Sequence, residues 1–166
     1  EEGVGELLVL AVSVAEEFHG LGSGFREHGL DGTLGFPPHS LPWEAGPVDR
    51  LAVSPQFKGN LMSYGALVTA AEAKLHTLDD GVHPGAMVNF DNTARRQWRP
   101  DIWYGANPYT FRRWVGNAAS AVSHRPESER LVFINAWNEW AEGAVLEPTD
   151  RFGLTFLQAV RDVAYA

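Results

Sequence analysis

The sequence contains no cysteine, which excludes disulfide bonds and thiolate metal sites but does not fix the compartment. It also lacks an apolar run of about 18 residues, the length that a membrane-spanning helix needs. The chain opens with Glu1-Glu2, without the basic and apolar segments of a signal peptide. We therefore expect a protein without a membrane span, located in the cytoplasm, with a secreted or periplasmic location as the alternative.

Positive charge is scarce: 13 Lys and Arg residues stand against 21 Asp and Glu residues, and the net charge is −8. Basic residues form no cluster larger than pairs such as Arg95-Arg96, so nucleic acid is not an expected partner. The 6 histidines are scattered, without the His-x-x-x-His spacing of a metal site. The sequence therefore predicts neither a metal site nor a cofactor.

The most informative segment runs from Leu131 to Gly143. It begins with an almost unbroken apolar run, which is typical of a strand buried on both faces in a parallel sheet. In α/β proteins the catalytic and binding residues collect at the carboxyl ends of such strands, because helices cover the faces of the sheet. The candidate site residues that follow this run are Trp137, Asn138, Glu139, Trp140 and Glu142.

Glu139 and Glu142 are the candidate catalytic pair. If the chain turns helically after Ala136, their Cβ atoms lie roughly 5–6 Å apart. Mutual repulsion and the flanking tryptophans would keep one carboxyl protonated and the other ionised, which is the combination that breaks or makes a glycosidic bond. The alternative is that both acids simply favour the first turn of a helix whose N-cap is Asn138.

Two motifs carry a resemblance to a known family. The run Phe-Ile-Asn-Ala-Trp-Asn-Glu-Trp-Ala-Glu-Gly at 133–143, followed by Leu-Glu-Pro at 146–148, resembles the signature of the WbsX-like family of bacterial polysaccharide-locus proteins. Phe-Asp-Asn-Thr-Ala-Arg-Arg at 90–96 resembles the aromatic-Asp-Asn-Thr-x-Arg-Arg segment of that family. The family is named for glycosyl transfer but is similar to glycoside hydrolase family 99, the endo-α-mannosidases.

The resemblance implies a (β/α)8 barrel that acts on glycans. It implies that Glu139 is a base acting on the 2-hydroxyl of the substrate, and that Glu142 is a general acid and then a base. Ala141 stands where the mannosidases usually have His, so the substrate stays open, and hydrolysis and glycosyl transfer both remain possible reactions.

The rest of the chain predicts strands and helices in alternation. Patterns of buried strands span Leu7–Val14, Asp31–Phe36 and Ala86–Phe90, before the run that begins at Leu131. Amphipathic helices are expected at Ser63–Leu78, from Asn107 to Val122 and at about Gly153–Ala164. Residues 15–28 indicate a loop with a short helix, residues 37–57 a long aperiodic loop, and no β-hairpin is indicated.

This order predicts an α/β fold of the (β/α)8 TIM-barrel type, in which residues 1–166 form a single carboxyl-terminal portion of about four βα units. Both motifs belong to the carboxyl-terminal half of the family's domain. Four parallel strands leave open edges, so we expect another chain or a missing amino-terminal half to complete the barrel. The chain does not begin with Met, and we interpret Glu1 as a processing or fragment boundary.

Further candidate substrate contacts lie outside the pair of acids. Asp91, Asn92 and Arg95 follow the third strand, where they could bind sugar hydroxyls or an anionic group. His39 lies in the long loop and Glu147 after the main motif. The ordinary alternatives are turn and cap residues at 91–93, an exposed or backbone-bonded imidazole at position 39 and a structural turn at position 147.

The first functional hypothesis is a carbohydrate-active enzyme domain that cleaves or transfers a glycosyl unit of an oligosaccharide or polysaccharide through two carboxylates. One alternative is a glycosyltransferase of polysaccharide biosynthesis, although the chain has no Gly-rich phosphate loop and no Asp-x-Asp motif. The other alternative is a non-catalytic fragment that binds glycans or takes part in assembly.

Overall fold

The computed structural model describes residues 7–14, 22–39, 41–46 and 54–166. Parallel pairing joins strands from along the chain. β1 (Leu10–Ser13) pairs with β2 (Gly32–Gly35), and β2 pairs with β4 (Val82–His83). β5 (Gly85–Met87) pairs with β7 (Phe133–Asn135). Only Pro84 separates β4 from β5, and its carbonyl accepts a hydrogen bond from Phe133 N at 2.9 Å. The described residues thus form a mixed α/β fold with parallel pairing, and they do not close into a barrel.

Strands β2 and β5 approach each other more closely than side chains allow. A Cβ atom at Gly85 would lie 2.0 Å from the carbonyl oxygen of Gly35. Glycine is therefore required at position 85, and a substitution there would push the two strands apart.

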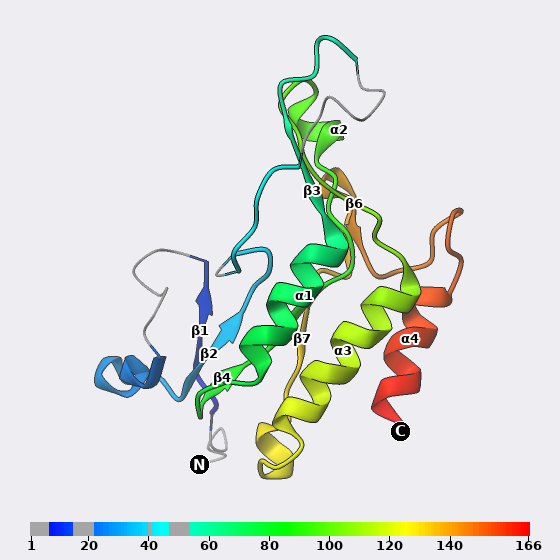
Figure 1. Ribbon diagram of the computed structural model, residues 1–166. Coiled ribbons are helices and arrows are strands. Elements are labelled where there is room, and N and C mark those ends of the chain that lie inside the picture. Colours follow the sequence, from blue (N-terminus) through cyan, green and yellow to red (C-terminus); the bar gives the residue numbers. More distant parts are fainter. Residues whose placement is uncertain (1–6, 15–21, 40, 47–53) are drawn as a thin grey trace, which may run out of the picture.

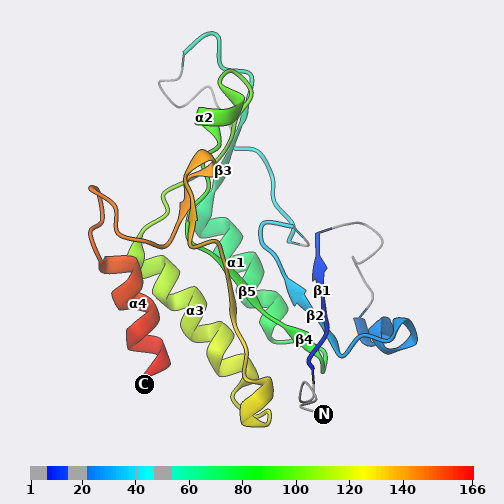
Figure 2. The same cartoon turned by 180° about the vertical axis from the view of Figure 1, so that it is seen from behind.

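Three helices lie side by side in the order α1 (Tyr64–Leu75), α3 (Pro108–Val122) and α4 (Thr155–Ala164) (Figure 1). Seen from behind, β5 and the segment of β7 lie in front of α1 and α3, with no α-helix of the described residues on that side (Figure 2). Side chains cap two of these helices, because Ser63 Oγ accepts from Ala66 N at 3.2 Å and Asn107 Oδ1 from Thr110 N at 3.0 Å. Pro108 occupies the first turn of α3, where its missing N–H group costs no hydrogen bond.

The core lies between these helices and the strands. Tyr64 of α1 and Trp114 of α3 meet edge to face with ring centroids 6.0 Å apart, and both are buried. The Tyr64 hydroxyl donates to Met87 O of β5 at 2.6 Å, so that one side chain joins a helix to a strand. Burial raises the pKa of Tyr64, which keeps the phenol neutral.

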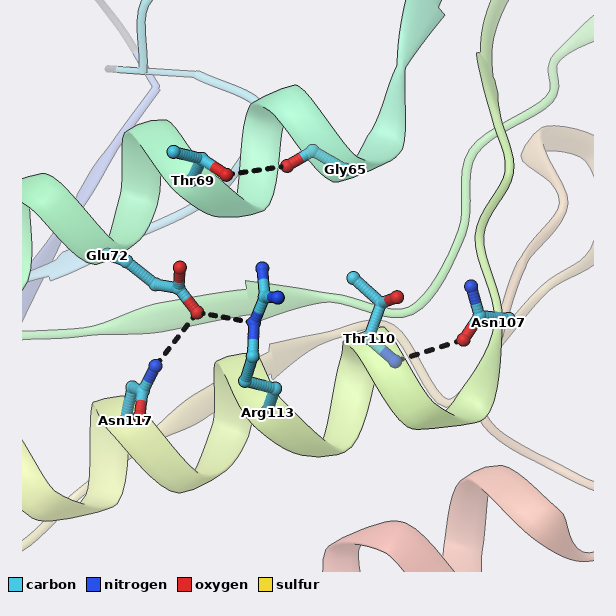
Figure 3. Close-up of polar contacts among 7 residues, drawn as sticks. All are labelled: Gly65, Thr69, Glu72, Asn107, Thr110, Arg113 and Asn117. Carbon is cyan, nitrogen blue, oxygen red and sulfur yellow. Dashed lines mark hydrogen bonds and ion pairs between the residues drawn. The ribbon is translucent and has the colours of Figure 1, made fainter.

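A polar contact joins the exposed sides of α1 and α3 (Figure 3). Glu72 Oε1 accepts from Arg113 Nε and from Asn117 Nδ2, both at 2.8 Å. Arg113 and Asn117 are exposed, and their contacts with Glu72 link the two helices.

Strands β3 (Asn60–Ser63) and β6 (Asp101–Tyr104) form a parallel pair that the sequence did not predict. The pair extends beyond the helices and carries the short helix α2 (Thr93–Arg96) near its end (Figure 1). Asn60 Nδ2 donates to Asp101 Oδ1 at 2.8 Å across the pair. β3 begins just after the long loop predicted at 37–57. Only the first part of the predicted strand Ala86–Phe90 is a strand, because β5 ends at Met87.

The prediction of a buried strand at Leu7–Val14 is wrong in its burial. β1 is a strand, but apolar residues in and beside it are 40–69% exposed: Leu7, Leu8, Val9, Val12 and Val14. Among the described residues β1 pairs with β2 alone, so one edge has no partner. An apolar edge strand of this kind is a surface for pairing with another strand.

Arg125, just after α3, connects that helix to the backbone at and before β4. Its guanidinium donates to Val82 O and to Asp79 O, both at 3.0 Å. The neighbouring His83 is buried, and burial, followed by the charge of Arg125, lowers its pKa although Glu129 opposes the shift. Within the described part of the chain, no helix has the length and apolar character to cross a membrane.

Candidate functional site

The segment after β7 forms a short hairpin. β8 (Asn138–Glu139) pairs antiparallel with β9 (Ala144–Val145), and one turn of 3-10 helix, η5 (Trp140–Glu142), connects them. No hairpin was expected from the sequence, and that expectation is wrong. The helical turn considered after Ala136 is present only as the single 3-10 turn η5, which begins at Trp140. Asn138 is not an N-cap, because it pairs with Val145 within the hairpin. Gly143 at φ 60° supplies the left-handed residue that ends η5 and lets the chain turn back.

The hairpin meets the second motif through the main chain. Asp91 N donates to Glu142 O at 2.7 Å. A Cβ atom at Gly143 would lie 3.2 Å from both Asp91 N and Asp91 O, so only glycine fits this junction comfortably. The structure thus brings together two motifs that are far apart in the sequence, as expected for segments that follow the carboxyl ends of neighbouring parallel strands.

A salt bridge strengthens the same junction. Arg95 Nη1 of α2 lies 2.5 Å from Glu142 Oε1, and the two side chains are 55% and 24% exposed. A charge-assisted contact of this kind fixes the position of the Glu142 carboxyl group. Glu139 is exposed and makes no ion pair among the residues that the structure describes. The two candidate acids therefore stand in different surroundings.

The side chains of Asp91 and Asn92 hold the backbone of their own region. Asp91 Oδ1 accepts from Thr93 N at 3.0 Å and from Thr93 Oγ1. Asn92 is 4% exposed, and its Oδ1 accepts from Asp101 N at 2.7 Å. These contacts are the turn contacts of the ordinary alternative, and they fix the start of α2 against β6.

The two tryptophans of the motif do not enclose the acids. Trp137 and Trp140 are 52% and 57% exposed. Trp140 Nε1 donates to Glu147 Oε1 at 2.5 Å, and Leu146 N and Glu147 N both donate to Trp137 O. These two side chains do not form the environment of low dielectric constant that was expected around the pair of acids. More than half of each tryptophan is exposed and accessible to a ligand.

The loop after β2 is attached to the end of β7. Asn135 Nδ2 donates to Pro37 O at 2.7 Å, while the buried Asn135 Oδ1 has no partner among the described residues. The sequence analysis missed Asn135, although a single polar residue inside an apolar run was a signal for it. His39 is exposed and stacks on Phe36 at 6.3 Å, and no described contact joins it to either acid.

In the described part of the chain, no group of three or more His, Asp or Glu side chains is placed to hold an ion. The carboxylates described above can perform acid, base and hydrogen-bond chemistry, and the indoles can stack on a ligand.

Parallel strands with intervening helices, and carboxylates and exposed indoles beyond the strand ends, are the arrangement of a carbohydrate-active α/β domain. The family model described as Glycosyltransferase WbsX matches residues 1–160. The chain belongs to this WbsX glycosyltransferase family.

Curated relatives and solved structures are also similar to the chain. The uncharacterized protein WxcX of Xanthomonas campestris pv. campestris, from strains ATCC 33913 and B100, is 41% identical over 144 residues. This match covers 82% of the chain but 20% of the relative, so the chain spans about one fifth of the length of these relatives.

Among solved structures, a GH99 endo-alpha-mannosidase from Bacteroides thetaiotaomicron is 12% identical with a TM-score of 0.48, over 96% of this chain and 46% of that chain. A glycoside hydrolase-like protein is 14% identical with a TM-score of 0.48, over 81% and 37% of the two chains.

Proposed function

We propose that the chain carries the catalytic carboxylates of a domain that cleaves or transfers a glycosyl unit of an oligosaccharide or polysaccharide. The observation that carries this proposal is the junction between Asp91 and Glu142, which unites the two motifs in one place. Glu139 and Glu142 lie within one hairpin there, one exposed and one paired with Arg95. Two carboxyl groups in unlike surroundings can take unlike roles in acid and base catalysis.

In the proposed reaction Glu139 removes the proton of the substrate's 2-hydroxyl, and that oxygen attacks the anomeric carbon. The bond from the anomeric carbon to the leaving oxygen breaks, and Glu142 gives its proton to that oxygen. Water, in hydrolysis, or an acceptor hydroxyl, in transfer, then opens the anhydro-sugar and returns both acids to their starting states. Arg95 holds the Glu142 carboxyl in place through its contact with Oε1.

The first test is a product analysis. The purified protein is incubated with a panel of α-linked oligosaccharides, and separately with nucleotide sugars plus acceptor glycans, since the family name favours transfer as the second candidate. The double variant Glu139→Gln/Glu142→Gln is expected to lose about 100- to 10,000-fold in turnover of whichever substrate the parent uses.

The matched control for this test is Glu127→Gln, an exposed acid in the 3-10 helix η4 (Glu127–Glu129), which should behave like the parent. Products identified by chromatography and mass spectrometry distinguish hydrolysis from transfer. Unchanged turnover in the double variant would remove both acids from the mechanism. Glycan binding without turnover in the parent would instead support a non-catalytic binding module.

We also propose that further parallel strands complete a (β/α)8 barrel, supplied by another chain or by an amino-terminal half of the same domain. Three observations support this. Among the described residues β1 and β7 each pair on one side only, the apolar side chains around β1 are exposed, and one face of β5 and β7 has no α-helix (Figure 2). Parallel strands are normally covered on both faces, so these surfaces lack their natural cover.

The exposed edge predicts that the isolated chain self-associates through β1. Val12→Lys places a charge on this strand, where Val12 is 40% exposed, and should shift the chain toward the monomer in light scattering coupled to size exclusion. Leu154→Lys, at a 54% exposed apolar residue before α4, is the control and should leave association unchanged. A parent that stays monomeric at high concentration would contradict the proposed role of this edge.

A further inference from the structure

We infer that the indole of Trp140 is a stacking subsite for a neutral pyranose ring, and that Glu147 is the positioning residue that holds this indole. The inference rests on the proposed action on glycans and adds to it a place where one sugar unit binds. It also changes the role of Glu147, from a substrate contact to a residue that acts through Trp140.

The first observation is an exposed indole whose edge is fixed. Trp140 is 57% exposed, yet its Nε1 donates to Glu147 Oε1 at 2.5 Å. Indole has a single hydrogen-bond donor, so this contact satisfies its polar edge and leaves the apolar faces to other partners. A side chain that is already oriented loses less conformational entropy when a ligand binds than a free one.

The second observation is that Glu147 is itself held. Glu147 N donates to Trp137 O at 3.1 Å, and Leu146 N donates to the same oxygen at 2.9 Å. The residue is half-buried where the chain leaves β9, so its carboxylate reaches Trp140 from a fixed backbone position. A surface salt bridge between two long mobile side chains would not give this rigidity.

Trp140 belongs to the same hairpin as both candidate acids. It begins η5, the helical turn that ends at Glu142. A sugar ring stacked on this indole would therefore contact the hairpin that carries Glu139 and Glu142.

Charge and ring chemistry define the class of ligand. The face of an aromatic ring carries partial negative charge and attracts the C–H groups on one face of a pyranose. Glu139, Glu142 and Glu147 crowd this hairpin, and the whole chain has a net charge of −8. Arg95 offsets the charge of Glu142, and Glu139 and Glu147 still leave an excess of negative charge on the hairpin. This charge would repel an anionic sugar, so the subsite suits a neutral one.

The experiment measures the Kd for neutral oligosaccharides by calorimetry in a Glu139→Gln background, where turnover is suppressed. Trp140→Ala should raise Kd about 3- to 10-fold, the range expected for loss of one aromatic contact. Trp98→Ala is the matched control, because Trp98 is 55% exposed and no described residue binds its indole nitrogen, and it should leave Kd unchanged.

A double-mutant cycle separates positioning from direct contact. Glu147→Ala should weaken binding when Trp140 is present and have no further effect in a Trp140→Phe background, since phenylalanine has no N–H for Glu147 to accept. Glu147→Gln keeps an acceptor and should resemble the parent. Without any ligand, the indole N–H resonance of Trp140 should move in Glu147→Ala and not in Trp98→Ala.

Each outcome bears on the inference. An unchanged Kd in Trp140→Ala, with turnover by the parent, overturns the subsite and leaves the proposed function standing. An equal loss from Glu147→Ala in both backgrounds overturns the positioning role, because Glu147 would then contact the sugar itself. Trp140-dependent binding without turnover supports the subsite and overturns catalysis, and a parent that binds no glycan overturns both.

Discussion

Replacing Glu142 with glutamine is expected to lower kcat on an unactivated glycoside about 100- to 10,000-fold, the usual contribution of a general acid or base. Glutamine keeps the shape of the side chain and a hydrogen bond to Arg95, but it carries no transferable proton. The loss should depend on the leaving group. The leaving group of an activated aryl glycoside departs as a stable anion, so its oxygen needs little protonation. Glu142→Gln should therefore retain most of the parental rate on such a substrate.

Glu139→Gln should give the opposite pattern, because the base is needed whatever group departs. Its rate should fall by a similar factor on activated and unactivated substrates alike. Steady-state kinetics of the two single variants on both substrates checks this, with Glu127→Gln as the control. An equal loss from Glu142→Gln on both substrates would contradict its assignment as the acid.

The second large effect concerns stability. Trp114→Ala is expected to lower the free energy of unfolding by about 3–5 kcal/mol, the range for removing a large aromatic residue from a packed core. Trp114 is 1% exposed and contacts Tyr64, so its loss leaves a cavity between α1 and α3. Urea denaturation followed by circular dichroism measures the change.

Tyr109→Ala is the matched control, because Tyr109 lies on the same helix and is 76% exposed. Its effect should stay within about 0.5 kcal/mol, as is usual for surface positions. A loss of less than about 1 kcal/mol for Trp114→Ala would show that this contact contributes little, and that the helices are held chiefly by the polar link at Glu72.

The helices could be predicted because local chemistry specifies them. In α3, Asn107 caps the first turn, Pro108 fits it, and the buried face is the one that the spacing of Phe111, Trp114 and Val115 predicts. The parallel strands could be predicted from apolar runs, and the meeting of the two motifs followed from the geometry of strand ends. All these inferences use periodicity or covalent shape, which a single sequence contains.

The hairpin and the β3–β6 pair could not be predicted in the same way. β8 and β9 are 2-residue strands, too short for any alternation to show. β3 has the sequence Asn-Leu-Met-Ser, and it is a strand because β6 pairs with it, far along the chain. The contact of Arg95 with Glu142 joins side chains 47 positions apart, and it depends on how both backbones turn.

The junction at Gly143 has a consequence for how this family can diverge. Because peptide groups fasten Asp91 to the hairpin, residues at positions 139 and 141 can be exchanged without loosening the frame that presents them. One backbone can therefore display different chemical groups over evolutionary time.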